Sequence, residues 1–233
     1  MKLKESWATA AAMVALSGAA QAALVNRGGG MIYDTTRNIT WLADMNYAAT
    51  SGYAVANAGG SGSNRISANG QMGWDAATTW ANNLVYGGFS DWRLPTLNPS
   101  DSTCGGEFGF GTGYNCSGGE FSGLFVTDLG NKKQESVLDL TGDTAEQIAN
   151  LALFSNVQSR VYWSGTEYAP PSVDAWAFNT SAGAQTHSPK IRFSYAVAVR
   201  PGDVAAAVPE PQTLALALLA LGATVVARRR RSR

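Results

Sequence analysis

Residues 74–97 read WDAATTWANNLVYGGFSDWRLPTL, and the first half of this stretch predicts a helix. Its apolar side chains recur at the three- and four-residue spacing of one helix face. Glycines lie at both ends of the pattern, and Pro95 stops the short connector that follows. We therefore expect an amphipathic helix of about three turns that covers one side of the core. Its apolar face consists of Trp74, Ala77, Ala81, Leu84 and Val85.

Segments of high β-propensity lie on both sides of this helix and are separated by turn signals. Residues 31–42 predict a hairpin with a turn in its middle. The last third of the chain predicts three β segments, at 161–168, 174–183 and 194–202. The order of hairpin, helix, loop, helix and β meander favours an α+β domain. In such a domain we expect an antiparallel sheet, two main helices and long loops, with the two chain ends close together on the sheet.

Two further helices and one long loop complete this prediction. Ser117 and Glu120 have the S-x-x-E spacing of a capping box, so a second helix should begin there with Glu120 as a cap rather than a ligand. A third, short helix is indicated over residues 144–151. The segment 49–70 is small, polar and rich in glycine, which predicts a long loop or an insertion.

Aromatic and basic residues inside these patterns are expected to be structural. Arg93 and Arg200 should form ion pairs with Asp91 or another carboxylate rather than contact a ligand. Tryptophans within helix and strand patterns usually belong to the core. The tryptophans expected there are Trp41, Trp74, Trp92, Trp163 and Trp176.

The first 22 residues, MKLKESWATAAAMVALSGAAQA, have the three parts of a secretory signal peptide. Two early lysines precede an apolar stretch, and small residues follow at Ala20 and Ala22. These parts occur in the order that signal peptidase recognises. We therefore expect cleavage after Ala22 and export of the chain.

Residues 209–233 combine a Pro-Glu-Pro step, an apolar run and a block of arginines. The uncharged run from Leu214 to Ala227 has 14 residues. As a helix it would reach about 21 Å, whereas the hydrocarbon core is about 30 Å thick. We expect an apolar helix that enters the inner membrane transiently, with the arginines on the cytoplasmic side; a permanent tail anchor is the alternative. The motif residues are Pro209, Glu210, Pro211, Arg228, Arg229, Arg230 and Arg231.

The region 23–208 between these ends has the length of one domain. It contains 10 basic and 15 acidic residues, a net charge near −5. Phosphate binding needs clustered lysine and arginine, so this balance argues against nucleic acid as a partner. The chain has one histidine, His187, and neither a G-x-S-x-G elbow nor a Walker A loop. We therefore predict a protein that is not an enzyme.

The only two cysteines, Cys104 and Cys116, lie in one glycine-rich segment. An even cysteine count in an exported chain predicts a disulfide. A metal site would need more ligands, and no histidine is close in the sequence. We expect the disulfide and no metal site.

Candidate binding residues lie around the predicted loops between the late β segments, because rigid scaffolds commonly present function on loops. They offer carboxylate, amide and aromatic groups that can bind sugar hydroxyls, although an ordinary polar loop is the alternative. The candidates are Glu167, Tyr168, Asp174, Asn179, Gln185 and His187.

The features of the C-terminal segment resemble the PEP-CTERM sorting signal. This resemblance implies recognition and cleavage by an exosortase, a membrane protease of exopolysaccharide-producing bacteria. The mature protein would then reach the cell surface or the extracellular matrix of a Gram-negative-type bacterium.

Six blocks between about Gly29 and Gly202 resemble, in the same order, the Lcl C-terminal domain family. The resemblance implies a C-type-lectin-like architecture and a role in adhesion or glycan binding in a biofilm, with an extracellular polysaccharide as ligand. The blocks are MIYDTTRNITWLAD, WDAATTWANNLVYGGFSDWRLPTL, GEFSGLF, YWSGTEY, DAWAFNTSAG and YAVAVRPG.

The resemblance implies no catalytic centre and no cofactor. Calcium-dependent lectins carry E-P-N and W-N-D motifs, and the sequence has neither, so calcium has no support here. Two alternatives stay open. One is a structural matrix protein without a glycan ligand. The other is an enzyme similar to the formylglycine-generating enzymes, which share a related fold and use cysteines.

Overall fold

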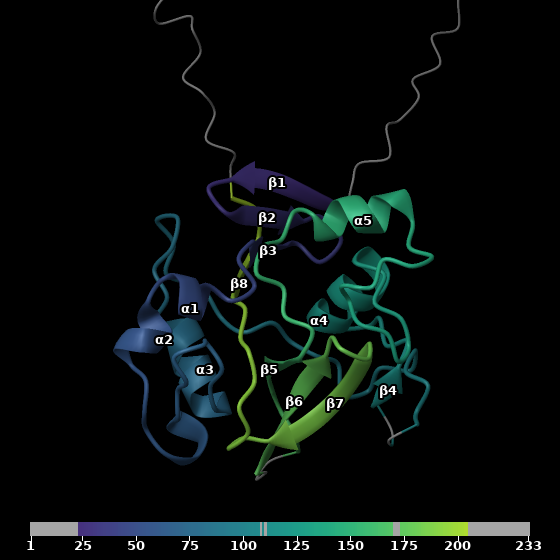
Figure 1. Cartoon of the computed structure of the whole chain (residues 1–233). Helices are drawn as coiled ribbons and strands as arrows, with labels where there is room; N and C mark the ends of the chain where they lie inside the picture. The colour runs from purple at the N-terminus through teal and green to yellow at the C-terminus, as the bar shows by residue number, and fades with distance from the viewer. Residues whose placement is uncertain (1–22, 108, 110, 170–172, 205–233) are drawn as a thin grey trace, which may run out of the picture.

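The computed structural model describes residues 23–107, 109, 111–169 and 173–204 (Figure 1). The predicted signal peptide and the predicted C-terminal apolar helix lie outside the described residues. Within the described part, no helix is long and apolar enough to cross a membrane.

The first sheet holds both ends of the described chain. In spatial order its strands are β1 (Leu24–Gly28), β2 (Met31–Asp34), β3 (Ile39–Leu42) and β8 (Val199–Pro201), and all neighbours are antiparallel. Arg27 donates two hydrogen bonds to Asp203, at 2.8 and 2.5 Å, and so fastens the first strand to the last. The predicted hairpin and the expected closeness of the two ends are therefore confirmed.

A second antiparallel sheet lies below the first in Figure 1. Its strands, in spatial order, are β4 (Gly113–Tyr114), β7 (Ala184–Pro189), β6 (Asp174–Asn179) and β5 (Val161–Glu167). The sequence predicted a single sheet, so the pair of sheets is a correction. Strand β7 was missed because its residues, AQTHSP, lack the alternating apolar pattern of a half-buried strand.

The predicted β segment 194–202 bonds to both sheets. Its first part bonds to the second sheet, where the Trp163 amide donates to the Tyr195 carbonyl at 2.9 Å. Its later part bonds to the first sheet, where the Leu42 amide donates to the Ala198 carbonyl at 3.0 Å. Only its end, β8, is a regular strand. One extended segment therefore runs from one sheet to the other.

Helix α3 (Trp74–Asn82) confirms the helix predicted from the opening stretch, although it ends earlier than expected. The chain leaves the helix at Asn83, and asparagine favours helix ends because its side chain competes for backbone hydrogen bonds. Val85 is exposed and does not belong to the buried face, contrary to the prediction. That face consists of Ala76, Ala77, Trp80 and Ala81.

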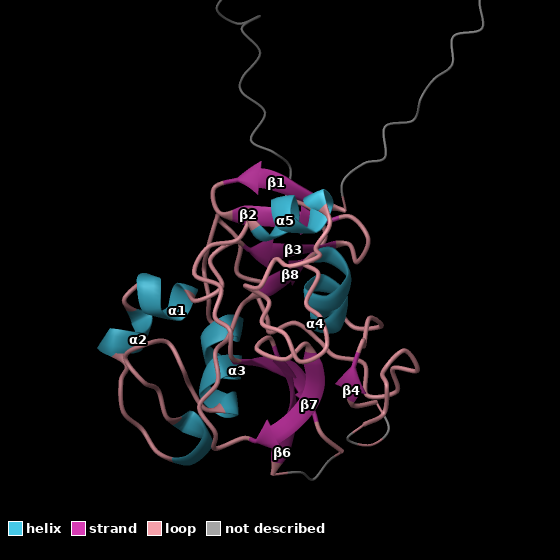
Figure 2. Cartoon of the chain, turned by 45° about the vertical axis from the view of Figure 1, so that its right-hand side comes forward, coloured by secondary structure: helices cyan, strands magenta, loops and turns pink. Residues whose placement is uncertain are grey.

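The segment 49–70 is more ordered than predicted. It includes the end of α1 (Tyr47–Thr50), α2 (Tyr53–Ala56) and the 3-10 turn η1 (Gly62–Asn64). Gly52 separates the first two helices with a φ of +80°, a conformation that costs glycine little. Figures 1 and 2 place α1, α2 and α3 together on one side of the molecule.

The second predicted helix exists, but it begins at Glu120 rather than at a Ser117 cap. Ser117 instead bonds to the Thr103 hydroxyl through its amide and its side chain. The helix starts as α4 (Glu120–Ser122) and widens into the π-helix η2 (Gly123–Asp128), which the Leu129 amide closes on the Leu124 carbonyl at 2.9 Å. The expected capping box is therefore wrong.

The Glu120 carboxylate binds Arg93 instead of capping a helix. Two hydrogen bonds from Arg93, at 2.7 and 2.8 Å, and one from the Thr96 amide reach it. Burial by itself would raise the pKa of Glu120, but these donors hold it below its usual value. Arg200 similarly binds Asp91, at 2.8 and 3.0 Å. The predicted structural ion pairs of both arginines are confirmed.

The third helix, α5 (Ala145–Leu151), agrees with its prediction. Thr144 and Gln147 form a capping box, because each side chain bonds to the backbone amide of the other. Four of the five tryptophans expected in the core are buried, and Trp74 is half-buried with its indole N–H bonded to the Ser164 carbonyl.

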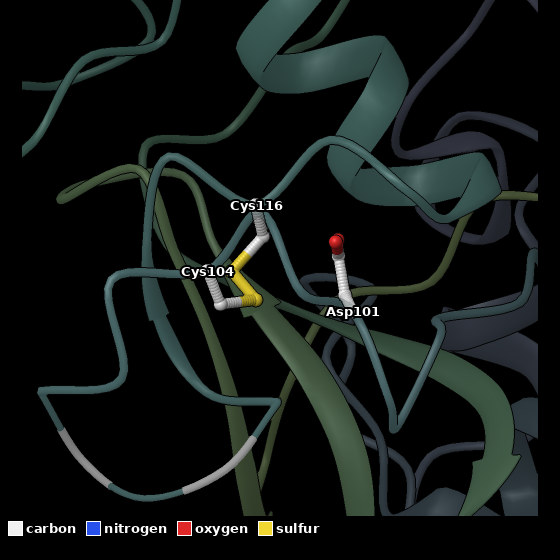
Figure 3. Close-up of side chains that lie close together, drawn as sticks. All are labelled: Asp101, Cys104 and Cys116. Atoms are coloured by element: carbon white, nitrogen blue, oxygen red, sulfur yellow. A yellow bond between two sulfur atoms is a disulfide. The ribbon is translucent and has the colours of Figure 1, made fainter.

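The predicted disulfide between Cys104 and Cys116 is present (Figure 3). Replacing both cysteines with serine is expected to lower the free energy of unfolding by about 3 kcal/mol, since the bond closes a short loop of the unfolded chain. Urea denaturation of residues 23–208 measures this difference. Wild-type protein treated with a reductant is the control and should lose the same amount. Equal stability of the variant and the oxidised wild type would contradict the expectation.

Candidate functional site

The structure brings four of the six predicted binding residues close together, where β5 and β7 end and β6 begins. They are Glu167, Tyr168, Asp174 and His187. The His187 ring stacks on Tyr168 with 4.1 Å between ring centroids, and its Nδ1 lies 2.7 Å from an Asp174 oxygen. The Glu167 carboxylate is bound by the Lys190 ammonium group. Tyr168, Asp174 and His187 thus contact one another, whereas Glu167 binds Lys190.

The other two predicted residues lie elsewhere. Gln185 belongs to strand β7, as His187 does, and not to a loop as predicted, because β7 adds one strand to the meander. The Gln185 side chain is buried and donates to the carbonyls of Asn98 and Gly111, at 2.8 and 2.7 Å. Asn179 ends β6 and accepts hydrogen bonds from Ser181, so it shapes the turn into β7.

Asp101 lies beside the disulfide, and its carboxylate is close enough to the sulfurs of Cys104 and Cys116 for the three side chains to resemble a metal-binding site (Figure 3). Both sulfurs are bonded to each other and are not available as thiolate ligands. The buried carboxylate of Asp101 accepts hydrogen bonds from Thr103 and from the Gly118 amide. The disulfide and the Asp101 hydrogen bonds therefore stabilise the loop that contains the two cysteines.

A polar cleft of about 340 Å³ lies between β2 and the start of α4. Its charged groups, Arg37 and Glu120, are already bound inside the protein. Arg37 pairs with Asp34 and Asp128, and Glu120 pairs with Arg93. This cleft has no free charge with which to hold a ligand.

A larger groove of about 460 Å³ lies between the α1–α2 pair and the C-terminal end of α3. We call it the tyrosine groove. Tyr47 and Tyr53 form its aromatic walls, and Asn83 supplies a side-chain amide, whereas the Asn57 side chain donates to the Tyr53 carbonyl at 2.9 Å. The residues that line it include no charged side chain. They are Tyr47, Ser51, Gly52, Tyr53, Ala56, Asn57, Trp80, Asn83, Leu84 and Val85.

Several polar groups of the tyrosine groove are available to a ligand. In the described part of the chain, no hydrogen bond is made by the hydroxyls of Tyr47 and Tyr53 or by the side-chain amide of Asn83. The Tyr47 ring is held edge-on against Tyr86 at 5.1 Å, and the Tyr86 hydroxyl donates to the Gly29 carbonyl. The groove thus combines a fixed aromatic wall with free donors and acceptors.

Sequence reasoning missed the tyrosine groove because its walls come from separate segments. Tyr53 and Asn57 belong to the stretch predicted as a loop, and Asn83 and Val85 follow α3. The available signal was two tyrosines, Tyr47 and Tyr53, at the edge of a segment made otherwise of small residues.

Comparison with protein families agrees with both resemblances. The model of the Lcl C-terminal domain matches residues 30–200, and the PEP-CTERM protein-sorting motif matches residues 207–231. No curated protein and no solved structure matches the chain. The sorting motif marks an exported cell-surface protein that is processed by an exosortase. The chain belongs to the Lcl C-terminal domain family.

Proposed function

We propose that this protein is a non-enzymatic surface or matrix protein that binds neutral carbohydrate in the tyrosine groove. The observation that carries the proposal is the uncharged lining of the groove, with tyrosine walls and free hydroxyl and amide groups. Sugar rings present apolar C–H faces that pack on aromatic rings, and their hydroxyls need neutral donors and acceptors. The net charge of residues 23–208, near −5, favours a neutral polymer over an anionic one.

The arrangement of the fold supports a C-type-lectin-like architecture. The first and last strands share one sheet, and long irregular segments connect the two sheets. The sorting motif supports transient insertion in the inner membrane, exosortase cleavage and release into an exopolysaccharide matrix. A carbohydrate ligand fits that destination.

The enzyme alternative depends on a reactive cysteine. Both cysteines of the described chain are in the disulfide, and no free cysteine is found there. A thiolate is the nucleophile in cysteine chemistry, so this state supports the non-enzymatic proposal. Titration of native protein should detect no free thiol before reduction.

Replacing Tyr53 with alanine is expected to weaken glycan binding about tenfold, equivalent to about 1.4 kcal/mol, because it removes one aromatic wall. Residues 23–208 would be tested by affinity electrophoresis against dextran, β-glucan, galactomannan and the producer's own polysaccharide, and against the anionic alginate. Each gel would be run with and without a calcium chelator, so that metal-dependent binding is detected.

Tyr168→Ala is the matched control, since it removes a tyrosine from the cluster around His187. If only Tyr168→Ala lowers binding, that cluster is the site and the tyrosine groove is not. Preference for alginate would contradict a neutral ligand. Absence of binding to every polysaccharide would leave a structural matrix protein as the better description.

A further inference from the structure

Most of the basic side chains in residues 23–208 are paired with carboxylates of the same chain. Of these ten basic side chains, seven form ion pairs with carboxylates. The other three, Arg65, Arg160 and Arg192, pair with no carboxylate in the part that the structure describes. In a domain with excess acid, such unpaired arginines are available for a partner.

Arg65 and Arg192 line the same cavity, which has a volume of about 540 Å³. Its other walls are Pro189, Ile191 and Phe193. The Arg65 guanidinium lies 3.7 Å from the centre of the Phe193 ring, and its buried Nε has no hydrogen-bond acceptor. Ile191 and Phe193 are 58% and 37% exposed. The cavity combines two cations with apolar walls and has no amide or hydroxyl side chain.

Backbone hydrogen bonds hold this cavity in place. Met72 and Ser194 exchange two of them, at 2.8 and 3.1 Å, which fixes the segment of Arg65 beside the segment of Phe193. The Arg192 amide closes a turn on the Pro189 carbonyl at 2.8 Å. Because little ordering is needed, the cavity is prepared for a partner that brings a carboxylate and apolar groups.

The chain itself carries a segment with that chemistry. Leu138 and Leu140 are 52% and 41% exposed, and they flank the exposed Asp139. The Asp139 carboxylate accepts a hydrogen bond from the Thr141 amide at 3.0 Å and forms no ion pair among the described residues. We call residues 138–140 the LDL loop.

The LDL loop is also held rigidly. The Asp139 amide donates to the Ser136 carbonyl at 2.9 Å. The Lys132 ammonium group donates to the Thr141 carbonyl at 2.7 Å and pairs with Asp143. The shape of the loop is therefore set before any partner arrives.

The LDL loop and the arginine cavity lie far apart on one molecule. Val137, next to the loop, donates to the Thr180 carbonyl in the turn that leads into β7, whereas the cavity lies at Pro189, where β7 ends. One copy cannot satisfy its own cavity across this separation. A contact between the LDL loop and the cavity would therefore join two copies.

We propose that the arginine cavity of one copy binds the LDL loop of the next copy, so that the protein assembles head to tail. Asp139 pairs with Arg65 and Arg192, and the two leucines cover Ile191 and Phe193. Such a contact joins two different surfaces and propagates into a ring or a filament. It is smaller than a standard interface, so its strength depends on the high local concentration of a surface layer. Assembly does not depend on glycan binding.

Two complementary variants of residues 23–208 test this proposal. Asp139→Lys removes the loop contact, and Arg65→Gln with Arg192→Gln removes the cavity contact. By sedimentation equilibrium, the average mass of the wild type should rise between about 10 µM and 1 mM, the range of weak association. The average mass of each variant alone should stay that of the monomer over the same range of concentration. Their equimolar mixture should form dimers and nothing larger, because it keeps one intact cavity and one intact loop per pair.

Arg160→Gln is the matched control, since it removes the third unpaired arginine from a site away from the cavity. Its assembly should equal that of the wild type, which separates the specific contact from net charge. If Asp139→Lys does not fold, Leu138→Ser with Leu140→Ser replaces it. A wild type that stays monomeric, variants that assemble normally, or a mixture that stays monomeric or grows beyond dimers would each overturn the proposal.

Discussion

Replacing Arg37 with methionine is expected to lower the free energy of unfolding by about 3–5 kcal/mol at pH 7, because it leaves two buried carboxylates without their cation. Arg37 lies 2.6 Å from Asp34 and 2.5 Å from Asp128. The three side chains are 13%, 0% and 8% exposed, so water cannot replace the lost charge. Urea denaturation followed by tryptophan fluorescence measures the change.

The loss should depend on pH in a defined direction. Burial raises the pKa of Asp128 above its usual value, although the charge of Arg37 opposes this effect. A carboxyl with a raised pKa in the folded state stabilises the fold below its unfolded pKa. That contribution is lost as the pH rises through the folded pKa. Without Arg37 the pKa of Asp128 rises further, so the loss should be largest at neutral pH and shrink towards about pH 4.

Arg27→Met is the matched control, because Arg27 also binds a carboxylate with two hydrogen bonds but lies at the surface with Asp203. Its replacement should cost at most about 1 kcal/mol. Adding Asp128→Asn to Arg37→Met should recover part of the stability. If Arg37→Met costs no more than Arg27→Met, the three buried charges are not coupled as described.

The second large effect is expected for Phe125→Ala, at about 3–5 kcal/mol of unfolding free energy. Phe125 is fully buried and stacks on Phe178 of β6, with 5.4 Å between centroids and 10° between ring planes. It also stacks on Phe121 at 5.3 Å and packs on Tyr162 at 5.9 Å. Removing it opens a cavity between the π-helix η2 and the second sheet. Denaturant unfolding measures the loss.

Phe193→Ala is the control for this substitution, because Phe193 is exposed, packs against Arg65 and is not one of the core residues. It should cost no more than about 1 kcal/mol. Similar losses for both phenylalanines would show that the aromatic cluster of Phe125 does not contribute more than an exposed ring.

Local patterns predicted the elements whose stability is decided nearby in the sequence. Helix α3 follows from apolar spacing, and β2 and β3 follow from β-prone runs about a turn. The short helix indicated over residues 144–151 corresponds to α5, whose capping box only the structure showed. The disulfide follows from cysteine count and export. The helix after Glu120 was predicted in the wrong register, because Arg93, 27 residues away, takes the carboxylate that a local cap would use.

The sequence by itself determined the α+β class, the main helix, the disulfide, the family and the sorting motif, since each depends on residues close in the chain or on an ordered set of blocks. Only the tertiary structure decided the division into two sheets and the positions of the binding surfaces. The tyrosine groove joins α1 and α2 to α3, and the arginine cavity joins Arg65 to residues more than a hundred positions later. Such surfaces depend on contacts between distant segments, which periodicity and spacing do not encode.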